Sequence, residues 1–203
     1  MSNQQRPARI VSLISSGTEI LFALGLGERV VGVSHECDFP PQAAARPRLT
    51  ASCIDSAAGS GQIDEQVKQR SVAGDALYEI DRAALIELRP DLVITQAQCD
   101  VCAVRYADVV QAVRSSPELA GTSVLPLNPQ SLDEVFADIV RIGDIAGASD
   151  RAQQVVSGLQ SRVANIRALT RNIPRSDLPR VACIEGIEPL MLAANCVPEL
   201  IDI

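Results

Sequence analysis

The sequence is poor in aromatic side chains and contains a single histidine. Its 203 residues include no tryptophan, three phenylalanines and two tyrosines. Large flat ligands are usually held by aromatic faces, so the chain has few side chains that can stack on such a ligand. A serine, histidine and aspartate triad would have to use His35, because the chain has no second imidazole.

Long apolar runs and an excess of positive charge are also missing. No run approaches the roughly 20 apolar residues that cross a bilayer, so we expect a protein that is not membrane-embedded. The net charge of −7 discourages binding to nucleic acids and to anionic membranes. The first residues show neither an apolar signal region nor a lipobox-like cysteine, so the sequence as written predicts a cytoplasmic protein.

The common enzyme motifs are absent as well. The chain contains no GxGxxG, GxxxxGK[ST], HExxH or GxSxG pattern. Ser15 and Ser16 precede a predicted helix in the manner of an anion-binding helix start, but the glycines of a phosphate loop are missing. We therefore expect a binding protein rather than an enzyme, with no required cofactor.

Alternating strand and helix signals predict an α/β fold, with a mostly parallel sheet and helices on both of its faces. The expected strands are residues 9–13, 30–33, a short one near 49, 92–95, 122–127 and 181–184. The expected helices begin after residue 17 and continue with 63–69, 81–88, 103–113, 131–146, 150–171 and a short one from 197. Pro40 and Pro41 are expected to prevent a helix from following the second strand at once.

These elements divide the chain into three parts. We expect a first α/β lobe at residues 1–130, a helical connection at 131–178 and the start of an incomplete second lobe at 179–203. The helix at 150–171 would be on the order of 33 Å long. One strand and one turn cannot enclose a core. The last part therefore belongs to a longer two-lobed protein, joins the first sheet, or pairs with a partner subunit to form a homodimer.

Two predicted strands run into loops that carry sulfur and imidazole. His35, Glu36 and Cys37 follow the second strand, and Gln96 to Cys102 follow the strand at 92–95. In an open parallel sheet such loops lie at the carboxyl edge, where ligands bind. We therefore expect His35, Cys37, Cys99 and Cys102 to converge at one edge of the sheet.

The Cys99-x-x-Cys102 pair has four interpretations. Both thiols are inert fillers, or they join Cys37 and His35 in a tetrahedral zinc site. Alternatively they form a dithiol-disulfide redox centre, or they contact a bound ligand directly. The pair is expected to start a helix, where free N–H groups lower the pKa of a thiol. Cys53, Cys183 and Cys196 stand singly among small or apolar residues and are expected to pack as small hydrophobes.

The order of several short segments resembles the substrate-binding proteins of vitamin B12 and iron-siderophore ABC importers, most of all the cobalamin-binding branch. The segments are Arg9-Ile-Val-Ser-Leu, Ser16-Gly-Thr-Glu-Ile-Leu-Phe-Ala-Leu-Gly, Val31-Gly-Val-Ser, Asp38-Phe-Pro-Pro and Leu88-Arg-Pro-Asp-Leu-Val-Ile, followed by the long helix. The resemblance covers nearly the whole chain. Members of this family work outside the cytoplasm and continue beyond the point where this second lobe stops.

The resemblance implies two α/β lobes joined by a rigid helix, with a corrinoid or metal-chelate ligand captured in the cleft between them for an ABC permease. It assigns one set of residues to the ligand site: Ser15, Ser16, His35, Glu36, Cys37, Phe39, Gln96 and Cys99 on the first wall and Glu185 on the second. Glu79 and Asp81 are candidates for docking to the permease.

The role of His35 stays open at this point. Imidazole and thiolate are suitable axial donors to the metal of a cobalamin or haem-like ligand, so one hypothesis places His35 or a neighbouring cysteine on that metal. The alternative is that His35 only hydrogen-bonds to a loop carbonyl. The second function that fits the sequence is a cytosolic zinc-binding or thiol-redox domain that uses His35, Cys37, Cys99 and Cys102.

Overall fold

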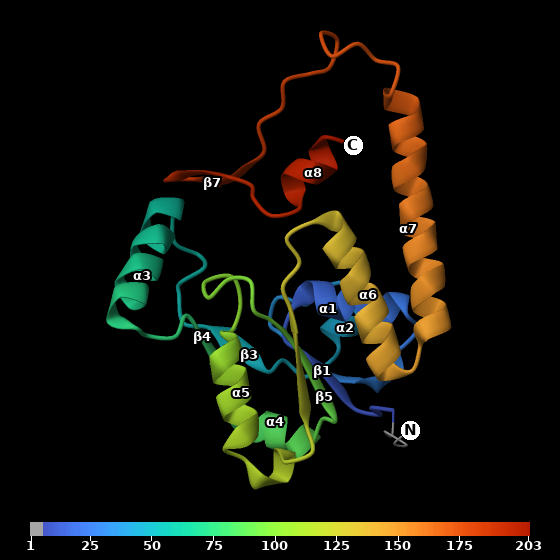
Figure 1. Ribbon diagram of the computed structural model, residues 1–203. Helices are drawn as coiled ribbons and strands as arrows, with labels where there is room; N and C mark the ends of the chain where they lie inside the picture. Colours follow the sequence, from blue (N-terminus) through green and yellow to red (C-terminus); the bar gives the residue numbers. More distant parts are fainter. Residues whose placement is uncertain (1–5) are drawn as a thin grey trace.

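The computed structural model describes residues 6–203, and a four-stranded parallel sheet forms its centre (Figure 1). The strands are β1 (Ile10–Ser12), β2 (Val30–Val33), β5 (Leu92–Gln96) and β6 (Ser123–Leu127), in the order β2-β1-β5-β6. Every neighbouring pair in this sheet is parallel. The predicted α/β class is confirmed.

Helices cover both faces of this sheet. Successive strand residues point to opposite faces, and the strands carry apolar side chains on both. Ile10, Leu92 and Ile94 pack on one side, with α1 (Ser15–Ala23), α6 (Leu132–Ala146) and α7 (Ser149–Thr170). Val11 and Val93 pack on the other side, with α4 (Arg82–Leu88) and α5 (Tyr106–Arg114). Burial on both faces explains why these strands are continuous apolar runs in the sequence.

A second, smaller sheet lies beside the first. It pairs β3 (Thr50–Ser52) antiparallel with β4 (Tyr78–Ile80), and α3 (Ser60–Ala73) connects the two strands. The strand expected near residue 49 is confirmed, whereas β4 escaped prediction because it has three residues and no fully buried position. The helix expected at 63–69 is longer, since α3 buries none of its residues and so shows no apolar period that marks its ends.

One short helix was not expected from the sequence, and another helix begins later than expected. The short helix α2 (Pro41–Ala44) follows the β2 loop directly, because a proline fits the first helical position, where its missing N–H is not needed. The helix expected at 103–113 begins only at Tyr106, so the two cysteines before it lie in a loop. Short 3₁₀ turns at Gly27–Arg29 and Pro117–Leu119 lead into β2 and β6.

The helix α6 begins and ends where its capping residues predict, whereas α7 begins after Ala148 without a side-chain cap. The Ser131 hydroxyl accepts a hydrogen bond from the Glu134 amide at the start of α6, and Gly147 ends that helix with a φ of +70°. Two residues separate α6 from the helix α7, which is 22 residues long. It runs along the side of the molecule and carries the chain away from the sheet (Figure 1).

The C-terminal segment returns across the top of the molecule in Figure 1. It contains β7 (Ile184–Ile187), β8 (Leu190–Leu192) and α8 (Val197–Ile201), with the two strands paired antiparallel. The strand expected at 181–184 therefore lies further along the chain, and it pairs with β8 instead of the first sheet. The Ser60 hydroxyl donates to the carbonyl of Glu188 at 3.1 Å and fixes the hairpin to α3.

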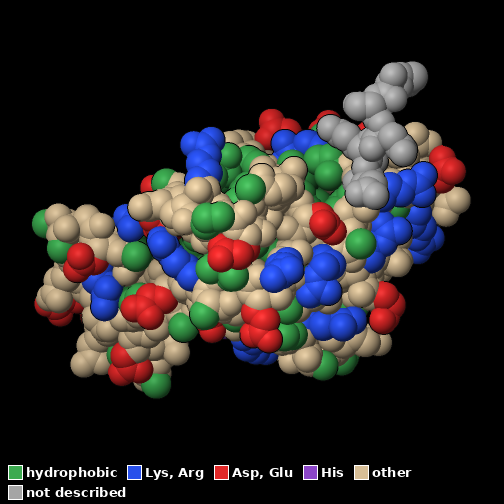
Figure 2. All heavy atoms as spheres, turned by 90° about the horizontal axis from the view of Figure 1, so that it is seen from below, with side chains coloured by type: hydrophobic (Ala, Val, Ile, Leu, Met, Phe, Trp, Pro, Cys, Tyr) green, Lys and Arg blue, Asp and Glu red, His purple; other side chains and the backbone are tan. Residues whose placement is uncertain are grey.

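The opposite end of the molecule shows a mixed surface. Figure 2 views this end from below, and basic and acidic side chains are interspersed across it. Within residues 6–203, none of the helices combines the length and the apolar composition that a bilayer crossing needs.

Candidate functional site

The carboxyl ends of β1, β2 and β5 enclose a hollow of about 210 Å³. Its lining comes from the loop after each strand, at residues 13–15, 34–36 and 102–104. β1 connects through α1 to β2 on one side, while its other neighbour is β5, so the connections change direction between β1 and β5. Such a switch point is where open α/β sheets bind ligands.

His35 is held in this hollow by a neighbouring strand. Its Nδ1 lies 2.7 Å from the Thr50 hydroxyl, which also accepts a hydrogen bond from the His35 amide at 3.1 Å. The imidazole lies beside the ring of Tyr78, with the ring centroids 5.6 Å apart. The partner of Nδ1 is thus a hydroxyl rather than the loop carbonyl of the predicted alternative, and the ring is fixed on the face that belongs to β3 and β4.

The other ring nitrogen has no such bond. His35 Nε2 lies 3.1 Å from Glu36 Oε1, yet it makes no hydrogen bond of good geometry with any group in the described part of the chain. The Glu36 side chain is 66% exposed, so it can turn away at little cost. Nε2 is buried in this arrangement, so a ligand could reach it only after a movement of Glu36 or of the loops around it.

The loop after β5 is fixed by hydrogen bonds to the buried side chain of Gln96. Gln96 is 6% exposed, and its Oε1 accepts hydrogen bonds from the amides of Gln98 at 2.7 Å and Cys99 at 2.8 Å. Its Nε2 donates to the carbonyl of Cys99. The Tyr78 hydroxyl donates to the carbonyl of Val101 at 3.1 Å. Gln96, which was expected to face the ligand, positions the loop instead.

The two thiols of this loop influence each other's ionisation. Partial desolvation, followed by the neighbouring Cys99 thiol and the negative charges of Cys99 and Glu185, raises the pKa of Cys102 to about 12. The expectation of a lowered pKa is wrong for Cys102. The physical reason is that α5 begins at Tyr106, four positions after Cys102, so the free N–H groups of its first turn are not next to this thiol.

Cys37 does not face the hollow. Its side chain is 1% exposed and packs in the core on the α1 side of the sheet, with its Sγ 3.1 Å from the Thr18 hydroxyl. Across residues 6–203, no group of three or more His, Cys, Asp and Glu side chains is arranged to hold a metal ion. The predicted zinc set of His35, Cys37, Cys99 and Cys102 is therefore wrong, because the turn after β2 carries Cys37 inward.

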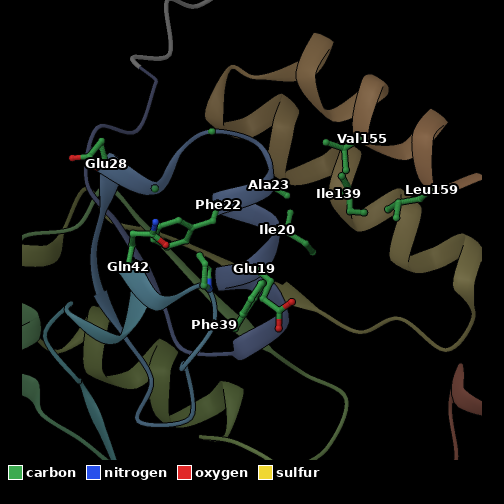
Figure 3. A pocket seen from close by; sticks show the side chains of 13 residues that line it. Glu19, Ile20, Phe22, Ala23, Glu28, Phe39, Gln42, Ile139, Val155 and Leu159 are labelled. Carbon is green, nitrogen blue, oxygen red and sulfur yellow. The ribbon is translucent and has the colours of Figure 1, made fainter.

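The remaining predicted residues are divided between several places. The Ser15 hydroxyl lines the hollow and donates to the carbonyl of Glu36 at 3.1 Å, whereas Ser16 is exposed and lies outside the lining. Phe39 is 60% exposed and lines a different hollow of about 690 Å³. Figure 3 shows Phe39 beside Glu19 of α1, with side chains of α6 and α7 on the other side of that hollow.

The second wall is represented by Glu185 on β7. This carboxylate is exposed, and its charge contributes to the raised pKa of Cys102, which places it near the loop after β5. Thr50 and Tyr78 were missed as site residues. They lie next to His35 because β3 pairs antiparallel with β4. No local sequence pattern predicts that pairing.

Comparisons with known proteins show the family and the fold of the chain. Residues 10–190 match the family described as periplasmic binding protein. An uncharacterized ABC transporter substrate-binding lipoprotein, YvrC of Bacillus subtilis, is 29% identical over 175 residues, which is 86% of this chain and 45% of that protein. The vitamin B12-binding protein of Pectobacterium carotovorum is 22% identical over 191 residues, or 93% of this chain and 56% of the relative.

Solved structures show the same fold. The vitamin B12-binding protein BtuF of Vibrio cholerae superimposes with a TM-score of 0.62 at 21% identity, over 92% of this chain and 59% of that one. The heme-binding protein RhuT of Roseiflexus sp. RS-1 gives a TM-score of 0.57 at 24% identity, over 83% and 52%. The chain thus spans about half the length of the curated relatives that it matches. Because the family match extends over most of the sequence, the chain belongs to the periplasmic binding protein family.

Proposed function

We propose that this chain captures a flat metal chelate, a corrinoid or a haem-like tetrapyrrole, for delivery to an ABC permease. The observation that carries the proposal is the hollow at the switch point of the sheet, with the single imidazole of the chain on its wall. The relatives support this ligand class, since some are named vitamin B12-binding and others heme-binding proteins. Binding, not catalysis, is the proposed activity.

The size of the hollow limits what enters it. Pockets that enclose a drug-sized ligand measure about 300–1,000 Å³. The hollow of about 210 Å³ is smaller, so it receives an edge or an axial position of the chelate rather than the whole ring. The rest of the ligand then lies between this edge and residues on the opposite side, where Glu185 stands.

His35 is the proposed axial donor to the metal of the ligand. Its Nδ1 is held by Thr50, which orients the ring and leaves Nε2 as the free donor. A hydrogen bond to the second ring nitrogen is the usual support of a metal-bound imidazole. Cobalt and iron both accept imidazole nitrogen, so the donor fits either ligand.

We propose the following organisation for this activity. Residues 1–130 form the first lobe, 131–178 the helical spine and 179–203 the start of the second lobe. The place of action is outside the cytoplasm, as for the family, and Glu79 and Asp81 remain candidates for contact with the permease.

Absorption spectroscopy tests the ligand and the donor together. Hydroxocobalamin and hemin are titrated separately into the wild type, His35→Ala and Glu36→Gln. We expect the spectrum of at least one ligand to shift with the wild type and with Glu36→Gln. His35→Ala should lose the shift and bind at least about tenfold more weakly, which corresponds to ~1.4 kcal/mol.

Gln42→Ala is the matched control, because Gln42 lines the other hollow. It should behave as the wild type. Unchanged spectra for His35→Ala would remove axial ligation from the proposal, and no binding of either ligand by calorimetry would overturn it.

A further inference from the structure

We propose that Cys99 and Cys102 form a reversible intramolecular disulfide on the wall of the candidate site. Both thiols are free, Cys102 is exposed and Cys99 is partly exposed. They lie at the two ends of the turn after β5, which residues 100–102 form, and Cys99 is among the groups that raise the pKa of Cys102. The formation of this bond does not depend on the proposed ligand. Only its effect on binding rests on the proposed function.

The loop geometry suits the bond. A four-residue turn holds its first and last α-carbons within about 7 Å, and a disulfide joins α-carbons up to about 6.8 Å apart. Gln96 fixes the backbone at Cys99, and Tyr78 fixes it at Val101. Gln98 Nε2 also donates to the carbonyl of Pro129 at 2.7 Å. The loop is thus held by three hydrogen bonds, and both thiols belong to this fixed turn.

The other cysteines of the first lobe are engaged elsewhere. Cys37 is buried next to Thr18. Cys53 lies in another part of the lobe, where burial followed by the charge of Glu79 raises its pKa. Neither arrangement offers a second thiol, so oxidation should be selective for Cys99 and Cys102.

The reaction needs an oxidant, and a small-molecule disulfide such as oxidised glutathione supplies it. The Cys99 thiolate attacks one sulfur of the small disulfide and releases the first small thiol. The Cys102 sulfur then gives up its proton and attacks the Cys99 sulfur, which releases the second small thiol. The protein loses two protons and two electrons, and the small disulfide gains them as two thiols.

The charges around the pair favour the closed bond. Dithiols whose thiolate is stabilised make strongly oxidising disulfides that are easily reduced. The carboxylate of Glu185 has the opposite effect here, because it disfavours a second negative charge at Cys102. The reduced form of this pair is therefore not stabilised by a thiolate. We expect the disulfide, once formed, to be reduced less easily than one with a stabilised thiolate.

The bond changes the wall of the candidate site. Cys102 lines the same hollow as His35 and Ser15. When its sulfur is bonded to Cys99, the thiol is removed from the lining and the turn loses its freedom to adapt. We expect the oxidised and reduced forms to differ at least about threefold in their affinity for the chelate.

The test uses the full chain in buffers that range from reduced to oxidised glutathione, with trapping by an alkylating reagent. Of the six cysteines, two should escape alkylation in the oxidised buffer, and the intact mass should be lower by two hydrogen atoms. Peptide mapping should identify the Cys99–Cys102 link. Cys99→Ser and Cys102→Ser should abolish it, whereas Cys183→Ser should leave it intact.

Alkylation of all six cysteines in the oxidised buffer would overturn the proposal, as would a link between any other pair. A second arm repeats the hydroxocobalamin and hemin titrations on both forms. Equal affinities would overturn the effect on binding. If neither form binds a chelate, the proposed function fails, while the mass measurement still decides whether the disulfide exists.

Discussion

Asp138 shows how a single residue sets a pH dependence. It lies on α6 with 8% of its surface exposed, and its Oδ1 pairs with Arg141 at 3.0 Å. Its Oδ2 is buried and has no hydrogen-bond partner within residues 6–203. Burial outweighs the attraction of the guanidinium, so the pKa of the carboxyl is raised above its ordinary value. The folded state thus holds this proton more tightly than the unfolded state does.

The raised pKa of Asp138 predicts how the free energy of unfolding changes with pH. The contribution of Asp138 is most favourable below its ordinary pKa and declines as the pH rises through the raised value, because the unfolded state then binds fewer protons than the folded one. Asp138→Asn should remove this decline, so that the variant gains stability relative to the wild type between acidic and neutral pH. Urea unfolding of both proteins at a series of pH values measures this difference in the free energy of unfolding.

Asp144→Asn provides the comparison, because Asp144 is an exposed carboxylate on the same helix. Its profile should run parallel to that of the wild type. A parallel profile for Asp138→Asn as well would show that the buried carboxyl does not control this pH range.

The site residues show which roles a sequence can assign. His35 was expected at the carboxyl edge of the sheet. It lies there because it follows the end of β2 by two residues, and the loop after a parallel strand starts at that edge. Cys37, two positions later, was assigned to the same site but packs inside. Gln96 was assigned to the ligand but supports a loop. Side-chain direction within a loop depends on its turns, which residue identity alone does not fix.

Two glycines distinguish a close helix contact from an open helix surface. A β-carbon added at Gly143 of α6 would lie 2.5 Å from the Ala152 β-carbon of α7. At Gly158, on α7, an added β-carbon meets nothing within 4 Å. The crossing of the two helices therefore depends on the first glycine and is indifferent to the second.

The two alanine substitutions should have opposite effects. Gly143→Ala should lower the free energy of unfolding by about 1–3 kcal/mol, because the helices must move apart. Gly158→Ala should raise it by about 0.5–1 kcal/mol, since alanine favours the helix more than glycine does. Chemical denaturation of both variants measures the pair, and a stabilised Gly143→Ala would contradict the close contact.

At the level of elements, the sequence was most informative where a hydrophobic core imposes a period. The strands β1, β2, β5 and β6 and the helix α6 were found because they bury apolar residues in the core. The strands β4 and β8 and the ends of α3 were not found. These elements bury no residue completely, so nothing forces a period on their sequence.

The whole molecule leaves an apolar hairpin uncovered. Ile187 is 81% exposed, Leu190 67% and Leu192 64%. The hairpin β7-β8 has two strands, which rarely form a stable sheet by themselves, and it presents open edges. Pairing between copies of the chain would cover this surface, and such a homodimer is one of the alternatives that the sequence left open.

Light scattering over a range of protein concentrations tests this pairing. We expect a dimer that dissociates on dilution, and the double variant Ile187→Lys, Leu190→Lys should remain monomeric at every concentration. Val72→Lys is the control, because Val72 is 91% exposed on α3, away from the hairpin. A wild type that is monomeric throughout would rule out the dimer.

The sequence by itself determined the class of this protein. Its apolar runs and caps specify a parallel α/β sheet, and the order of its short segments resembles the family to which it belongs. Only the tertiary structure decided the site. It placed Thr50 and Tyr78 beside His35 and turned Cys37 into the core. The physical reason is that burial imposes a pattern of apolar residues on the sequence of each element. Contacts between loops depend instead on how elements distant in sequence pack.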